Sequence, residues 1–170
     1  MYPATTTTSA ARPGYWRRRV SEPIRRQLTQ GADPAGLARA IAVGGVIAVN
    51  PFLGTTTLGC ALAGAVLRLN QPMLQVVNIL GGPLQLLLIV PWVRAGEWLY
   101  GARRMPIDPA TLAREFAAGP GAFLRRFGET GLHAATAWLI AAPVLGFGLF
   151  FATRRPLQTL ARRLTPQTSP

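Results

Sequence analysis

The stretch "IAVNPFLGTTTLG", from Ile47 to Gly59, decides how the chain can fold. It lies inside Ala40–Leu67, a run without charged side chains that exceeds the roughly 20 apolar residues needed to cross a membrane. Near the middle of this run stand Asn50 and Pro51, followed by Gly54 and three threonines. Proline lacks a backbone N–H and disfavours helical geometry in the residue before it, so a helix is expected to end here.

This break divides the run into two predicted short helices, Ala35–Val49 and Thr55–Leu69. A helix of that length measures about 22 Å, less than the hydrocarbon thickness of about 30 Å. A re-entrant hairpin, which turns back within the bilayer, therefore fits better than one long kinked helix. Each helix carries a stripe of small residues that would allow close packing in lipid. The stripes are Ala40, Gly44 and Ala48 in the first helix and Thr57, Ala61 and Ala65 in the second.

A second interruption follows in the next apolar run, Leu69–Val93. Asn78 and Gln85 flank it, and amides at membrane depth need partners because an unpaired polar group in hydrocarbon is costly. We therefore predict a second broken hairpin. Its turn, helix, break and further helix are expected at Asn70–Pro72, Met73–Leu80, Gly81–Pro83 and Leu84–Tyr100.

Two nearly identical segments, "DPAGLAR" (Asp33–Arg39) and "DPATLAR" (Asp108–Arg114), predict helix starts. An aspartate at the N-cap accepts hydrogen bonds from free backbone N–H groups, and a proline at the first helical position already has helical φ. The sequences that follow the two segments differ. Shared capping chemistry therefore explains the likeness, and we infer no internal repeat.

The whole pattern predicts an all-α integral membrane protein, with two broken (re-entrant) helical hairpins, an amphipathic connector and a C-terminal transmembrane helix. The expected segments are a disordered or basic interfacial segment at 1–32, the membrane domain at 33–101, the amphipathic surface connector at 102–129, the transmembrane helix at 130–153 and a basic tail at 154–170. In the first segment, Trp16–Gln30 has the spacing of an interfacial helix that Pro23 divides, with Ser21 capping the second piece, and a solvated basic tail fits this stretch equally well. Residues 1–14 and 165–170 are expected to be disordered.

Composition argues against several classes of protein. Hydrophobic residues make up 49% of the chain and charged residues 14%, and the mean hydropathy is +0.26. The net charge of +12 lies in arginine blocks that flank the apolar runs, which indicates contact with anionic lipid headgroups and no nucleic acid. With one cysteine, Cys60, and one histidine, His133, the chain offers no internal disulfide and no Cys/His metal cluster. We expect no catalytic residues and no cofactor, and hence no enzyme.

Several short motifs suggest a family. They are an Ala/Gly-rich first helix, P-x-x-G-x-x-T at Pro51–Thr57, L-R-x-N-x-P at Leu67–Pro72, a second tip that ends in proline, and Gly96-Glu97. Over about residues 35–101 the chain resembles a bacterial inner-membrane family known as domain of unknown function twenty sixty-two. Where that family commonly has Asn-Pro in the second tip, this chain has Gly82-Pro83. The resemblance implies a small inner-membrane protein, some of whose relatives are fused to or found near envelope-polysaccharide glycosyltransferases.

Polar and turn-forming residues at the two breaks are the candidate substrate site. In transporters, half-helix ends and free backbone groups at such breaks hold substrates or ions. The candidate substrate-binding residues are Asn50, Pro51, Gly54, Thr55, Thr57, Asn78, Gly82, Pro83 and Gln85. The same residues also fit tight turns with internally satisfied amides, and the sequence leaves both interpretations open.

Charged residues near the ends of the apolar runs are a second group of candidates. Arg94 and Glu97 are three positions apart on a predicted helix and can form an interfacial ion pair. Headgroup contacts are expected from Arg68, Arg103 and Arg104.

The arginines also expose a conflict about topology. If both hairpins enter from one face, Arg68 and the region 103–126 share the cytoplasmic side. The last helix then leaves Arg154 and Arg155 outside, against the positive-inside rule. Either that helix does not cross, or one predicted hairpin is a single kinked span.

Two functions fit these features. The first is binding or moving a lipid or lipid-linked envelope substrate at the broken-helix tips of a multi-pass protein in the bacterial inner membrane. A few short helices rarely enclose a path alone, so a homo-oligomer is expected. The alternative is a non-catalytic scaffold or anchor for envelope-biosynthesis enzymes. Transport predicts that Asn50→Leu and Gln85→Leu abolish activity without blocking insertion. A scaffold predicts that the loss comes from neutralising Arg17–Arg19 or Arg154–Arg155.

Overall fold

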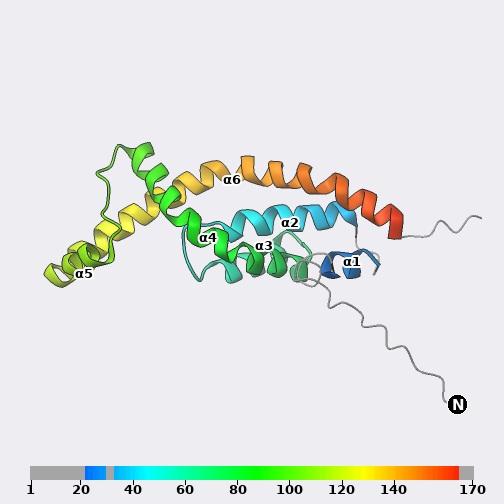
Figure 1. Ribbon diagram of the computed structural model, residues 1–170, viewed down its shortest axis with the longest axis horizontal. Helices are drawn as coiled ribbons and strands as arrows, with labels where there is room; N and C mark the ends of the chain where they lie inside the picture. The colour runs from blue at the N-terminus through cyan, green and yellow to red at the C-terminus, as the bar shows by residue number, and fades with distance from the viewer. Residues whose placement is uncertain (1–21, 30–32, 165–170) are drawn as a thin grey trace, which may run out of the picture.

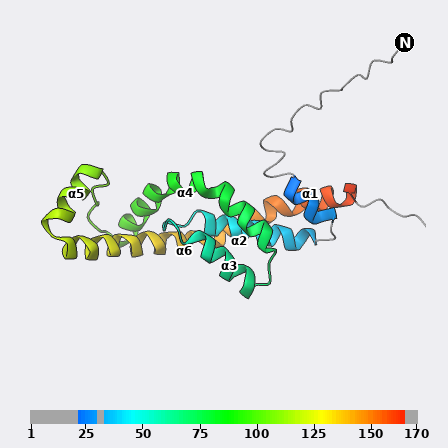
Figure 2. The same ribbon diagram turned by 90° about the horizontal axis from the view of Figure 1, so that it is seen from below.

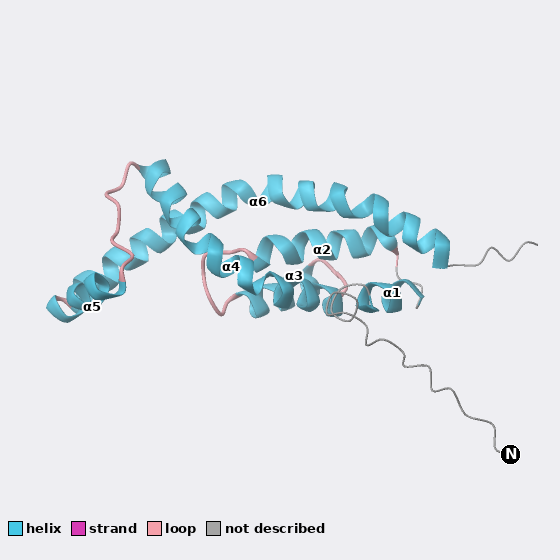
Figure 3. Ribbon diagram, in the orientation of Figure 1, coloured by secondary structure: helices cyan, strands magenta, loops and turns pink. Residues whose placement is uncertain are grey.

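The computed structural model describes residues 22–29 and 33–164, and every regular element in these ranges is an α-helix (Figure 3). The elements are α1 (Glu22–Thr29), α2 (Pro34–Ala48), α3 (Thr56–Val66), α4 (Gln71–Tyr100), α5 (Pro109–Ala118) and α6 (Pro120–Leu164). The predicted all-helical class is thereby confirmed for the described residues. The expectations for the two ends of the chain and for the cap at Ser21 lie outside them.

Helix α2 occupies the centre of the bundle, with α6 on one side and α3 and α4 on the other (Figure 1). α2 and α3 form a short hairpin, and the much longer α4 and α6 run past it in opposite directions. We call the end of the bundle that holds Asp33, Arg68 and Leu157 the proximal end. The end that holds Tyr100 and α5 is the distal end. In both ribbon views α5 stands beside the first turns of α6, away from α2 and α3 (Figure 2).

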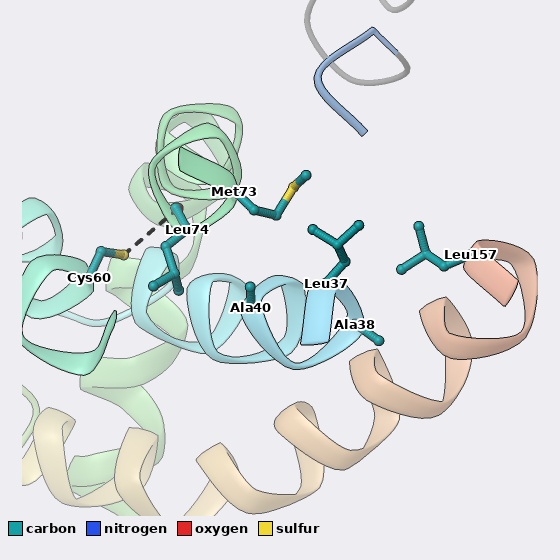
Figure 4. Packing of buried hydrophobic residues seen from close by; sticks show 7 residues of the cluster. All are labelled: Leu37, Ala38, Ala40, Cys60, Met73, Leu74 and Leu157. Carbon is teal, nitrogen blue, oxygen red and sulfur yellow. Dashed lines mark hydrogen bonds between the residues drawn. The ribbon is translucent and has the colours of Figure 1, made fainter. Parts of the chain in front are cut away.

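The packed core lies near the proximal end, where four helices meet (Figure 4). Its most buried side chains are Leu37, Ala38, Ala40, Cys60, Met73, Leu74 and Leu157. The predicted small-residue stripe of α2 is confirmed, because Ala40, Gly44 and Ala48 are all buried. Gly44 packs against Leu74 and Val77, so a side chain there would press on α4.

For α3 the predicted packing face is wrong by one position. Thr57, Ala61 and Ala65 are exposed, and the residue before each of them is buried: Thr56, Cys60 and Gly64. The Cys60 thiol contacts the Leu74 carbonyl oxygen at 3.9 Å, and the missing side chain of Gly64 leaves room for Gln71. Both contacts face α4, which fixes the rotation of α3.

Both predicted aspartate caps are confirmed. The Asp33 carboxylate accepts hydrogen bonds from the backbone N–H groups of Ala35 and Gly36 at 3.1 and 2.8 Å, and Pro34 is the first residue of α2. At the second site Asp108 accepts from the Thr111 N–H at 2.8 Å, and this hydrogen bond holds the pKa of the carboxyl below its ordinary 3.8. These caps place the starts of α2 and α5.

The second predicted break is wrong, because α4 is one continuous helix through Gly81, Gly82 and Pro83. Gly81 serves close packing: a Cβ there would collide with Ala48 of α2. Pro83 and Pro91 are both exposed, so their rings point away from neighbouring helices. A proline removes one backbone hydrogen bond, and helices packed alongside can hold the helical path despite that loss.

The C-terminal helix is longer than expected. α6 runs through Pro143, does not end at Arg154 and Arg155, and continues through Pro156. Leu157 explains the continuation, because it is only 5% exposed and packs against the core near the start of α2. The connector predicted at 102–129 is divided between a loop, α5 and the first turns of α6. All ten residues of α5 remain at least partly exposed.

α4 and α6 are each long and apolar enough to cross a membrane. Only 22% and 11% of their most apolar segments are buried, whereas the core helix of a soluble protein is mostly buried. Large apolar side chains are therefore exposed along both helices. They include Ile79, Leu84, Leu86, Leu87 and Val90 on α4 and Leu139, Ile140, Val144, Phe147 and Phe151 on α6.

The continuous α4 also corrects the expected placement of the arginines. Arg68 precedes this 30-residue helix and Arg103 follows it, so about 45 Å of helix separates them. They therefore lie at opposite ends of the bundle and do not share one face as expected. Of the two explanations for the topological conflict, the structure supports the one in which a predicted hairpin is a single helix.

Candidate functional site

The turn between α2 and α3, at residues 49–55, is held by side-chain hydrogen bonds within itself. Asn50 Oδ1 accepts from the Phe52 N–H at 2.8 Å, and Asn50 Nδ2 donates to Thr55 Oγ1 at 3.1 Å. The Thr55 hydroxyl in turn donates to the Phe52 carbonyl at 3.0 Å. Gly54 has φ +84°, a conformation that other residues rarely adopt, and it completes the reversal.

Gln85 of α4 joins this turn to the long helix. Its side-chain Nε2 lies 3.2 Å from the carbonyl oxygens of both Asn50 and Phe52, and 3.4 Å from Asn50 Oδ1. Gln85 and Asn50 are 6% and 8% exposed. We call Asn50, Thr55 and Gln85 the tip network. Its amide groups are bonded to other parts of the protein, which is the internally satisfied arrangement that the sequence left open.

Two tryptophans that were not among the predicted site residues extend the same arrangement along the end of α2. The Trp92 indole N–H donates to the Val49 carbonyl at 2.7 Å, and the Trp138 indole N–H donates to the Val46 carbonyl at 3.0 Å. The last carbonyls of a helix have no partner within it. A donor-only side chain inside an apolar run, opposite a predicted helix break, is the signal that could have found both residues.

The remaining candidate substrate residues do not converge on the tip network. Asn78 Nδ2 lies 3.4 Å from the Thr57 hydroxyl, in a separate contact between α4 and α3. Gly82 has open space where a side chain would stand, and Pro83 is exposed. The sequence therefore placed Asn50, Thr55 and Gln85 together correctly but grouped them with residues that face elsewhere. Whether any of them contacts a substrate stays a prediction.

An apolar cavity of about 470 Å³ lies beside the tip network, between α2, α4 and α6. All of its lining residues are glycine, alanine, valine, leucine or tryptophan. We call it the apolar groove. Val49 and Trp92, which are joined by the indole hydrogen bond, form part of its wall, and Leu84 and Leu88 of α4 and Leu149 of α6 face it. Such a cavity suits a hydrocarbon chain and offers nothing to a polar solute.

The predicted ion pair at the distal end is present. Arg94 Nη1 lies 2.7 Å from Glu97 Oε2, and Glu97 is only 3% exposed. The other carboxylate oxygen of Glu97 accepts from the Met105 backbone N–H at 2.7 Å, and Arg94 also donates to the Met105 carbonyl at 3.3 Å. Both side chains thus fasten the loop that follows α4. In the described ranges, histidine, cysteine and acidic side chains form no group of three that could hold a metal ion.

The three predicted headgroup residues are all exposed, at two different places. Arg68 lies in the turn between α3 and α4 at the proximal end, with φ +51°, and Arg103 and Arg104 lie in the distal loop. They are exposed at the two ends of a helix with an apolar, exposed surface between them. Basic residues in this position occur at membrane surfaces.

A family model described as "Uncharacterized protein conserved in bacteria (DUF2062)" matches residues 17–165. The chain belongs to the DUF2062 family. The DUF2062 match covers all six helices, so it extends well beyond the motifs of residues 35–101 and includes α5 and α6. No curated protein and no solved structure matches the chain.

Proposed function

We propose that this protein is a multi-pass, non-enzymatic protein of the bacterial inner membrane, in which α4 and α6 cross the bilayer. The α2–α3 hairpin would enter from the proximal end and turn back at the tip network. The exposed apolar surfaces of α4 and α6 support the crossings. The hairpin is supported by the paired carbonyls of Val46, Val49 and Asn50, because a broken helix in hydrocarbon must have its backbone groups satisfied by the protein.

Within this membrane, the proposed function is to bind or move a lipid or a lipid-linked envelope substrate. The apolar groove carries this proposal, because it is continuous with surfaces of α4 and α6 that lipid would cover. One hydrocarbon chain would occupy the groove, and the tip network would hold the end of α2 that forms one wall. A homo-oligomer, with copies sharing the exposed faces of α4 and α6, is part of the proposal.

The test reduces the volume of the apolar groove by enlarging one of the side chains that line it. Leu84→Trp adds volume at a residue that lines the groove, whereas Leu86→Trp makes the same change on the same helix at an exposed residue outside it. The full chain is reconstituted with a phospholipid that carries a photoactivatable group on its acyl chain, and crosslinked peptides are mapped by mass spectrometry.

We expect crosslinks to Leu88 and Leu149 in the parent protein, their loss in Leu84→Trp and their retention in Leu86→Trp. Circular dichroism of each variant would verify that the helices are intact. Crosslinks spread evenly over α4 and α6, with the same pattern in both variants, would contradict a dedicated groove and indicate ordinary surrounding lipid.

A scaffold for envelope-biosynthesis enzymes is the second candidate, and α5 favours it. This helix has no buried residue, and with the start of α6 it exposes Phe116, Leu124 and Phe127. Such a surface could receive a partner protein. If the scaffold is the main role, Phe116→Ser with Phe127→Ser would abolish function while Leu84→Trp would leave it unchanged, which separates the two proposals.

A further inference from the structure

A second cavity, of about 500 Å³, lies at the distal end between the loop that follows α4 and the first half of α6. Unlike the apolar groove, it is lined mostly by polar and charged residues, with Ala102 and Ala122 beside them. Three arginines, one carboxylate, one hydroxyl and one imidazole face it: Arg103, Arg125, Arg126, Glu129, Thr130 and His133. Arg103 comes from the loop, whereas Arg125 and Arg126 come from α6, so the cations converge from two different elements.

The ion pairs leave two of these cations without a counterion. Arg126 lies 3.4 Å from Glu115 of α5. Within the described ranges, Arg103 and Arg125 have neither an ion pair nor a hydrogen bond through their side chains, and Glu129 forms no ion pair with them. At the proximal cavity, by contrast, Arg39 is paired with Asp33, and Arg68 is the one lining arginine without an ion pair in the described residues. Like charges gathered at one cavity repel, so an anion that enters this one is favoured.

The cavity is also held in place by contacts on both sides. Tyr100 stacks on the His133 imidazole with ring centres 4.2 Å apart and donates to the Thr136 hydroxyl at 3.2 Å. A side chain at Gly96 would collide with the His133 backbone, so α4 and α6 touch closely here. The loop that carries Arg103 is fastened two residues later, at Met105. The backbone that carries the guanidinium groups is therefore held in place before a ligand binds, which lowers the conformational entropy lost on binding.

We propose that Arg103 and Arg125, with Arg126 beside them, form a binding site for a phosphate group. Guanidinium groups donate in a planar fork that matches the geometry of phosphate oxygens. The cavity adjoins the apolar part of α6, which continues from Leu132, so a phosphate carried by a lipid headgroup can reach it from the membrane surface. A free phosphate-bearing solute can reach it from water. The site is separate from the apolar groove and does not depend on what occupies that groove.

The experiment compares two charge-matched double variants of the full chain in a neutral detergent. Arg103→Gln with Arg125→Gln removes the two unpaired cations of the cavity. Arg155→Gln with Arg162→Gln removes the same charge from exposed positions at the other end of α6. Binding of phosphatidic acid and of phosphatidylcholine is titrated by native mass spectrometry, with and without millimolar inorganic phosphate, and circular dichroism verifies the fold of each variant.

We expect phosphatidic acid to bind more tightly than phosphatidylcholine to the parent protein. The cavity variant should lose about tenfold in affinity for phosphatidic acid and the control less than twofold. Competition by inorganic phosphate would identify a free phosphate-bearing solute as an eligible ligand, and lack of competition would identify a lipid-borne one. Equal losses in the two double variants, or no loss in either, would overturn the proposal, because the arginines would then act only through general surface charge.

Discussion

The side-chain amide of Gln85, in the middle of α4, donates to the backbone carbonyl oxygen of Asn50, 35 residues earlier, at 3.2 Å. The same nitrogen lies 3.2 Å from the Phe52 carbonyl. A continuous helix would supply the donors for these positions from its own next turn. Here a second helix supplies them, so the chain can stop and reverse without burying unpaired carbonyl groups.

Replacing Gln85 by leucine should therefore destabilise the protein. The change removes the donor and leaves the carbonyl of the buried Asn50 without its Gln85 partner, which costs about 1–3 kcal/mol, whereas the Phe52 carbonyl keeps its hydrogen bond from the Thr55 hydroxyl. The midpoint of thermal unfolding in detergent measures the effect. Gln75→Leu is the matched control, because Gln75 makes a single long contact, 3.4 Å, with the Thr57 carbonyl. Equal destabilisation of the two variants would show that the hydrogen bonds of Gln85 in the tip network contribute no more to stability than the single long contact of Gln75.

Gly96 and Gly82 allow a comparison of two glycines in one helix. A Cβ at Gly96 would collide with the backbone of His133, and backbone cannot move aside easily, so Gly96→Ala should cost about 1–3 kcal/mol. Gly82 has open space around it, and Gly82→Ala should stabilise α4 by about 0.5–1 kcal/mol through better helix propensity. Chemical unfolding of the two variants measures the difference. A neutral Gly96→Ala would contradict the close contact of α4 with α6.

The ends of the bundle should label from opposite sides of a membrane. In a Cys60→Ala background, single cysteines replace Arg68, Arg155 or Arg104, and a membrane-impermeant maleimide is applied to intact cells and to inverted vesicles. Positions 68 and 155 should react from one side and position 104 from the other, because α4 and α6 separate them. Labelling of positions 68 and 104 from the same side would contradict two crossings.

The cap of α5 should depend on pH. The hydrogen bond from the Thr111 backbone N–H lowers the pKa of Asp108 below 3.8. The ionised carboxylate therefore stabilises the helix start fully above pH 3.8, and this stabilisation is lost as the pH falls through the lowered pKa. The protection factor of the Thr111 amide, which is its hydrogen-exchange rate relative to the intrinsic rate at the same pH, should fall several-fold over that acidic range. Asp108→Asn keeps an acceptor that does not titrate, so its protection factor should lack this pH dependence. A parent protein that behaves like Asp108→Asn would refute the cap.

Local chemistry explains which parts of the fold could be predicted. The aspartate-proline starts and the Asn50-Pro51 stop act through neighbouring backbone groups, so residues 33–51 alone contain the information. Gly81–Pro83 carries similar local signals for a break. α4 nevertheless continues there, because Gly81 packs closely against Ala48 of α2. The sequence alone does not distinguish a glycine that ends a helix from one that allows a second helix to pack closely against it.

The candidate site shows the same limit. That Asn50, Thr55 and Gln85 belong together could be predicted, because amides in apolar surroundings must find partners. For Trp92 and Trp138 the apolar run shows that each indole N–H needs an acceptor, but the acceptors themselves could not be predicted, because they lie 43 and 92 residues earlier in the chain. The packing face of α3 was also wrong by one residue, because small residues occur on both of its sides and only contact with α4 selects one.

The indole bonds of Trp92 and Trp138 constrain how the protein is made. Their acceptors at Val49 and Val46 are synthesised 43 and 92 residues before the donors. During synthesis the Val49 carbonyl has no indole partner until residue 92 is added, and the Val46 carbonyl has none until residue 138 is added. The fold is therefore completed from its C-terminal part, and a chain truncated before residue 138 would leave the Val46 carbonyl without the hydrogen bond from Trp138.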